Sequence, residues 1–126
     1  MQIEIKGRNG VAITDELRAY ARRRFAKVDR QVHDPARLEL ELYEEHNPAI
    51  AQHFVVDAVL YVKGTTLRAS DRSYDMKHAI HEVSDELARQ LERHREKRRQ
   101  RRKAHKFAMS QMSGGSDPGY NRAIGT

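Results

Sequence analysis

The stretch from Asp75 to Lys106 most constrains how this chain can fold, because its thirty-two residues include neither Pro nor Gly. In its first half, large apolar side chains recur at intervals of four, three, four and four residues: Met76, Ile80, Val83, Leu87 and Leu91. This spacing places them on one stripe of an α-helix. Burial of such side chains contributes about 1.5–3 kcal/mol each. We therefore expect a helix whose first half docks on a hydrophobic core.

The second half of the same stretch is cationic. From Arg95 to Lys106, eight of twelve residues are Lys or Arg and one is acidic. The whole chain has a formal net charge of +6, whereas residues 1–94 carry 15 basic and 16 acidic groups. The basic excess is therefore local, which indicates a polyanionic partner. A nucleic acid fits better than a membrane, because residues 95–106 lack the large apolar anchors of a membrane-surface helix.

Length and composition suggest one ordinary domain with a basic extension and a tail. The chain has 126 residues and no Cys, which excludes disulfides and thiolate chemistry. A signal peptide and a run of about 18 apolar residues are both absent, so we expect a soluble, cytoplasmic protein. The predicted parts are an α+β domain over residues 1–94, a polybasic extension of the second helix over 95–106, and a disordered tail over 107–126.

Alternation of apolar and polar residues predicts four strands, at residues 1–6, 37–45, 53–63 and 66–70. Turn signals lie between them, including Arg8-Asn9-Gly10 and the Lys63-Gly64 hairpin. Residues 71–74 should connect the last strand to the long helix, with Asp71 or Ser73 as a cap.

An amphipathic helix is expected between the first two strands, beginning after Thr14 as N-cap and ending near residues 28–32. Its inward positions are apolar: Leu17, Tyr20, Ala21, Phe25 and Val28. Its outward positions are basic: Arg18, Arg22, Arg23, Lys27 and Arg30. A solvated helix face explains this pattern about as well as a binding surface does, but the second basic element at residues 95–106 favours binding.

The element order β-α-β-β-β-α predicts an α+β fold, a two-layer sandwich in which two helices pack on one face of a four-stranded sheet. The open face of the sheet would then carry four carboxylates: Glu4, Glu39, Glu41 and Asp57. We therefore expect a domain that is negative on its sheet side and positive on its helix side.

No pattern predicts an enzyme, a cofactor or a small-molecule substrate. His78 and His81 lie three residues apart beside Glu82 and Asp85 and could approach one metal ion. A closed metal site needs three or four ligands, and no other residue clearly completes this one, so no metal is expected. The chain also lacks a Gly-rich phosphate loop and any recognisable set of nucleophile, base and orienting group.

Four segments of the sequence form a recognisable set: MQIEIKG at residues 1–7, ITDELRAYARRRFAKVDR at 13–30, VDAVLYVKGTTLRAS at 56–70 and DMKHAIHEVSDELARQL at 75–91. They resemble the ribosome hibernation-promoting factors, which are also named sigma-54 modulation proteins and are relatives of the cold-shock ribosome inhibitor YfiA. The most specific pattern lies in the last segment: Asp75, Met76, Ala79, Ile80, Leu87, Arg89, Gln90 and Leu91. The chain is too short for the second domain of the family's long form, so the short form is the expected match.

This resemblance implies a fold similar to double-stranded RNA-binding domains and a protein that binds the small ribosomal subunit and its rRNA. Such a protein would occupy the channel of mRNA and tRNA, compete with both, and inhibit translation during stress or stationary phase. Carried over by position, the rRNA-binding residues are Arg22, Arg23, Lys27 and Arg30 on the first helix, and Lys77, Arg89, Arg93, Lys97, Arg98, Arg101 and Arg102 on the second. Many relatives have Lys where this chain has Glu86, which should repel phosphate.

Two other functions stay open. The first is a generic double-stranded RNA-binding module without ribosome preference, which would use the same basic surfaces. The second is a transcription modulator that acts through protein contacts, as the older family name suggests. It is less favoured because it leaves the basic helix face without a use.

Overall fold

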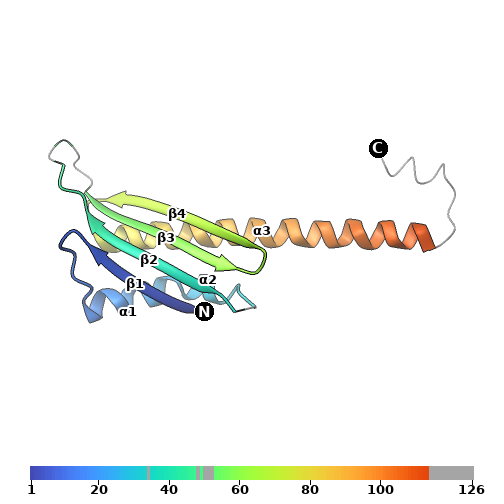
Figure 1. The fold of residues 1–126 in the computed structure, drawn as a ribbon, viewed down its shortest axis with the longest axis horizontal. Coiled ribbons are helices and arrows are strands. Elements are labelled where there is room, and N and C mark those ends of the chain that lie inside the picture. Colours follow the sequence, from blue (N-terminus) through green and yellow to red (C-terminus); the bar gives the residue numbers. More distant parts are fainter. Residues whose placement is uncertain (34, 48, 50–52, 114–126) are drawn as a thin grey trace. The chain divides into compact units, whose positions relative to one another are not determined.

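The computed structural model describes residues 1–33, 35–47, 49 and 53–113, and of residues 111–113 it describes the backbone alone. The chain divides into two compact units, of which the first spans Met1–Glu92 and the second begins at Arg93. Its elements, drawn in Figure 1, are β1 (Gln2–Arg8), α1 (Asp15–Arg24), α2 (Ala26–Asp29), β2 (Arg37–Glu44), β3 (Phe54–Val62), β4 (Thr65–Ser73) and α3 (Met76–Ser113).

The first unit is a two-layer sandwich. Its four strands form one sheet in the order β1-β2-β3-β4. β1 and β2 are parallel, since α1 and α2 lie in the connection between them, whereas β2–β3 and β3–β4 are antiparallel pairs. The helices of this unit cover one face of the sheet (Figure 1). The predicted α+β fold is therefore confirmed.

Alternating burial along the strands follows the alternating sequence. Leu38, Leu40 and Leu42 of β2 are at most 1% exposed, so they face the helices. The predicted connection at residues 71–74 was wrong, because Asp71–Ser73 belong to β4 and pair with Phe54–Val56 of β3. Polar side chains at the inward positions of this segment hide the usual strand signal. The first strand also extends two residues beyond its predicted end, to Arg8.

The first helix begins where the sequence predicts it and is interrupted before its predicted end. The Thr14 hydroxyl accepts a hydrogen bond from the Leu17 backbone N–H at 3.0 Å, as an N-cap does. At Phe25 the backbone leaves helical geometry, with φ −84° and ψ 1°, and this residue separates α1 from α2. No Gly or Pro marks the break. Phe25 and Val28 are nevertheless fully buried, as predicted.

The apolar stripe of α3 supplies much of the core. Its five members are between 0% and 9% exposed: Met76, Ile80, Val83, Leu87 and Leu91. They form one cluster with the buried residues of α1, α2 and the sheet. Asp75 caps the helix, since its carboxylate accepts a hydrogen bond from the Lys77 N–H at 3.3 Å. The Ser73 hydroxyl accepts from the Asp75 N–H at 3.2 Å, so it supports the cap without being one.

The second unit continues α3 as far as Ser113. Side chains from Arg95 to Ser110 are all exposed, so this part of the helix contributes nothing to the core of the first unit. The predicted disordered tail was wrong for residues 107–113, which are helical and contain no Gly or Pro to end the helix. The rest of that prediction, residues 114–126, lies outside the described residues. No helix in the described part of the chain could span a membrane.

Leu87→Ala should lower the free energy of unfolding by about 2–5 kcal/mol, because Leu87 is a fully buried member of the stripe. Urea denaturation followed by circular dichroism measures the change. Glu92→Ala, at an exposed position of the same helix, is the control and should stay within about 0.5 kcal/mol of the original protein. Equal effects of the two substitutions would show that the stripe does not carry the core.

Candidate nucleic-acid interface

The last turn of α1 presents cations to solvent. Arg22 and Arg23 are both exposed there, and Arg30 is exposed just beyond α2. None of the three forms an ion pair with another residue that the structure describes. Positive charge at a helix C-terminus is also favoured by the helix dipole. These three predicted rRNA-binding residues are therefore available to an anionic partner.

Cations from two helices lie close to the ring of Tyr20. Its ring centroid lies 5.1 Å from the guanidinium carbon of Arg24, 5.8 Å from that of Arg23 and 5.6 Å from the Lys77 ammonium. Cations at such distances over an aromatic face are attracted to it. The sequence pattern places Tyr20 among the inward apolar positions, and Arg24 is not one of the predicted rRNA-binding residues. The Arg residues three and four positions after this Tyr were the signal that could have identified both.

Two predicted cations are engaged in ion pairs between helices. The Lys77 ammonium lies 2.7 Å from a Glu16 carboxylate oxygen, which joins α3 to α1. This hydrogen bond raises the pKa of Lys77 and lowers the pKa of Glu16. Lys27 of α2 likewise pairs with Asp85 of α3, and the hydrogen bond from Lys27 lowers the pKa of Asp85. Each of the two Lys side chains is therefore already bound to a carboxylate.

A third predicted cation is paired within α3. Arg89 donates to Glu86 from Nη2 at 2.8 Å and from Nε at 3.2 Å. Gln90 donates to the other oxygen of Glu86 at 3.1 Å and to the Arg68 backbone carbonyl at 2.9 Å. Glu86 therefore binds a predicted rRNA-binding residue directly, in addition to the repulsion of phosphate that is expected of its charge.

The second unit is strongly cationic. From Arg93 onward the sequence holds ten Lys and Arg residues against two acids, whereas residues 1–92 hold fourteen against sixteen. The five candidates of this unit are all exposed on the helix: Arg93, Lys97, Arg98, Arg101 and Arg102. Burial, together with Arg98, Arg101 and Lys97, lowers the pKa of His94, so this ring adds little positive charge.

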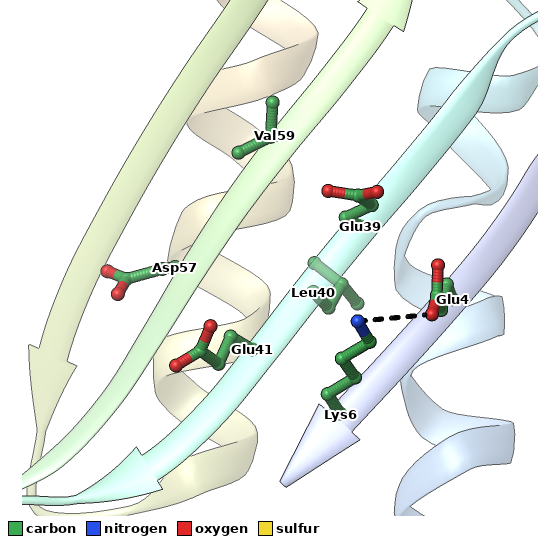
Figure 2. A pocket seen from close by; sticks show the side chains of 7 residues that line it. All are labelled: Glu4, Lys6, Glu39, Leu40, Glu41, Asp57 and Val59. Atoms are coloured by element: carbon green, nitrogen blue, oxygen red, sulfur yellow. Dashed lines mark ion pairs between the residues drawn. The ribbon is translucent and has the colours of Figure 1, made fainter. Parts of the chain in front are cut away.

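The open face of the sheet is not the negative surface that the sequence predicted. The four expected carboxylates do line it, around a shallow pocket with Lys6 and Val59 (Figure 2). The strand register also places five cations on this face: Lys6, Arg8, Arg37, Arg68 and Arg72.

Ion pairs link the charges of this face along and across the strands. Lys6 lies 3.4 Å from Glu4, Arg8 lies 2.7 Å from Glu41, and Arg37 lies 3.2 Å from Glu39. The sheet face is therefore mixed in charge, and the predicted polarisation of the domain was wrong on this side. The prediction counted the acids at outward strand positions and omitted the cations there.

The weak metal-binding pattern on α3 is partly assembled. His81, Glu82 and Asp85 each offer one ligand atom within 4.8 Å of the others. His81 Nε2 lies 3.2 Å from one Asp85 oxygen, however, and Lys27 binds the other. A cation would have to displace Lys27 from Asp85, and we assign no metal to these residues.

Comparison with known proteins places this arrangement in a family. The family model described as Sigma 54 modulation protein / S30EA ribosomal protein matches residues 3–99. The "Ribosome hibernation promotion factor" of Lactococcus lactis subsp. cremoris (strain MG1363) is 34% identical over 89 residues, which cover 68% of this chain and 44% of that protein. This chain therefore spans less than half the length of that relative.

Two solved structures share the fold. The Thermus thermophilus Protein Y N-terminal domain superposes with a TM-score of 0.65 at 23% identity, over 74% of this chain and 98% of that one. A ribosomal subunit interface protein from Coxiella burnetii gives 0.61 at 20% identity, over 75% and 98%. The family match itself runs from β1 into the basic part of α3. On that match, the chain belongs to the Sigma 54 modulation protein / S30EA ribosomal protein family.

Proposed function

We propose that this protein is a ribosome hibernation factor that binds the rRNA of the small subunit in the channel of mRNA and tRNA. It inhibits translation by occupancy, without catalysing a reaction, during stress or stationary phase. The observation that carries the proposal is the family match over residues 3–99, which includes α1, α2 and the first cations of the second unit. The names of the relatives in L. lactis and C. burnetii support it.

The exposed cations of α1 and α2 suit the recognition of folded RNA. RNA helices are read mainly through their shape, their phosphates and their 2′-hydroxyl groups. Arg22, Arg23 and Arg30 come from rigid helical elements or their immediate ends, so they can meet phosphates at fixed spacing. Arg guanidinium groups also bind phosphate oxygens in pairs, which adds geometric selectivity to the charge attraction.

The cations of the second unit have a different task in this mechanism. An exposed basic helix attracts RNA from a distance and neutralises phosphates with little regard to sequence. Affinity from such contacts depends strongly on salt because each contact releases counterions. The second unit thus supplies attraction, while the first unit supplies the shape that fits the channel.

Arg22→Glu combined with Arg23→Glu should abolish binding to small subunits, because two exposed attractive charges become repulsive. The measurement is co-sedimentation with small subunits in the presence of excess duplex RNA. The matched control is Lys63→Glu combined with Arg68→Glu, which changes the charge equally at exposed positions of the β3–β4 hairpin and should bind normally.

Circular dichroism of the Arg22/Arg23 variant should match that of the original protein, since neither side chain is buried. Undiminished binding of a folded variant would show that this helix face is only solvated. If the original protein leaves the subunits for duplex RNA, it is instead a generic double-stranded RNA-binding module.

Deletion of residues 93–126 should weaken the salt dependence of subunit binding while leaving the first unit folded. One side of a helix can offer roughly three to five of the cations to RNA, and each contact contributes a slope of about −0.7 to −0.9. The slope of log affinity against log salt should therefore flatten by about 2–4 units. Salt titrations of both proteins measure this change.

Thermal unfolding of the shortened protein is the control, and its midpoint should hardly change because the buried stripe ends at Leu91. Parallel salt slopes for the two proteins would mean that the second unit makes no phosphate contacts. Loss of folding would mean that the core extends beyond Glu92.

A further inference from the structure

We propose that the carboxylates of Glu16 and Asp85 determine which RNA the protein prefers. They hold Lys77 and Lys27 between the helices, and they exclude RNA that does not donate hydrogen bonds to them. This inference rests on the proposed function and concerns the same helical surface. It explains why a surface expected to bind RNA contains acids bound to the very cations expected to contact phosphate.

The geometry makes each acid a competitor of phosphate. Glu16 already takes a hydrogen bond from the Lys77 ammonium at 2.7 Å, and Asp85 binds the Lys27 ammonium. The Lys77 and Glu16 side chains are 43% and 76% exposed, so an RNA phosphate reaching this ammonium meets the carboxylate as well. The phosphate must displace the carboxylate or tolerate its repulsion, and either cost lowers affinity for generic RNA.

Glu86 repeats the arrangement on α3. It accepts two hydrogen bonds from Arg89, which is exposed, and one from Gln90, which is half-buried. Three of the six predicted rRNA-binding residues in the first unit, namely Lys27, Lys77 and Arg89, therefore carry their own carboxylate partner. Glu96, which pairs with Arg99, is by contrast the one acid among residues 93–113 of the second unit.

The two units thus differ in how much they favour any polyanion. The first holds fourteen basic and sixteen acidic residues, and the second holds ten and two. A regular RNA duplex displays mainly phosphates and 2′-hydroxyl groups, whereas folded rRNA also exposes base amino groups in unpaired segments. Amino groups and hydroxyls donate hydrogen bonds to carboxylates. The cognate rRNA surface can therefore donate hydrogen bonds to Glu16 and Asp85, and a generic duplex offers fewer such donors.

The competing explanation is that these pairs only hold the helices together. Partly exposed ion pairs stabilise proteins little, and the helices are already joined through the buried cluster that includes Phe25, Val28 and Ile80. A purely structural pair would change thermal stability when it is neutralised, but it would leave the preference between two RNA partners unchanged.

The test compares the original protein with Glu16→Gln, with Asp85→Asn and with both together. Dissociation constants are measured for small subunits and for a mixed-sequence RNA duplex of about 20 base pairs, a length that covers a typical double-stranded RNA-binding site. Asp15→Asn is the matched control, because it removes the same charge from an exposed neighbour of Glu16 that has no ion-pair partner in the described residues. Thermal unfolding is followed for every variant.

Each substitution frees one cation for one further phosphate contact. Duplex affinity should therefore rise about four- to sixfold per substitution at about 0.15 M salt, with a salt slope steeper by about 0.7–0.9. Affinity for small subunits should stay constant or fall, because the donors of the rRNA lose the carboxylate that accepts their hydrogen bonds. The preference for subunits over duplex should thus fall by at least about fourfold for each single variant, and Asp15→Asn should leave it unchanged.

An unchanged preference in the Glu16→Gln protein overturns the inference, and so does an equal loss of preference in the Asp15→Asn control. Glu16 is largely exposed, so this single variant decides the matter even where the double variant is less stable. The original protein in the same experiment tests the proposed function separately. Failure of that protein to bind subunits overturns the proposed function, whereas normal binding with an unchanged preference in the variants overturns only the inference.

Discussion

Burial of the apolar stripe of α3 against the sheet is the constraint on which the rest of this structure depends. Ile80, Val83 and Leu87 have no exposed surface and form one cluster with the leucines of β2 and with Phe25 and Val28. Burial of one stripe also fixes the directions of the other side chains of the helix. These include Lys77, which meets Glu16 of α1, and Asp85, which meets Lys27 of α2. The core therefore decides which charges meet between the helices.

The same stripe explains why the chain is divided electrostatically. It ends at Leu91, and the division into units falls directly after Glu92. Side chains before that point are selected for packing and for balanced ion pairs, and the first unit carries slightly more acids than bases. Beyond it the described side chains from Arg95 to Ser110 are exposed, and cations accumulate on this part of the helix. The chain thus combines a first unit of nearly balanced charge with an exposed cationic helix.

Much of the fold was predictable because its signals are periodic. The alternating leucines of β2, the stripe of α3 and the Thr14 cap all lie where the sequence places them. The errors arose where the sequence has no apolar period or helix breaker. The inward positions at the end of β4 are the polar residues Asp71 and Ser73, and neither Gly nor Pro lies at the break at Phe25. For the site, the sequence identified the exposed arginines, but the pairing of Lys27 with Asp85 joins residues fifty-eight positions apart and needs the fold.

Competition with tRNA measures most directly whether this protein occupies the decoding channel. Small subunits are saturated with the protein, and binding of tRNA to the peptidyl site is then followed by filter retention, with mRNA present. We predict that tRNA binding falls in proportion to the fraction of subunits that hold the protein, and that excess tRNA in turn releases the protein. Subunits that hold both molecules at full occupancy would contradict the proposed mechanism.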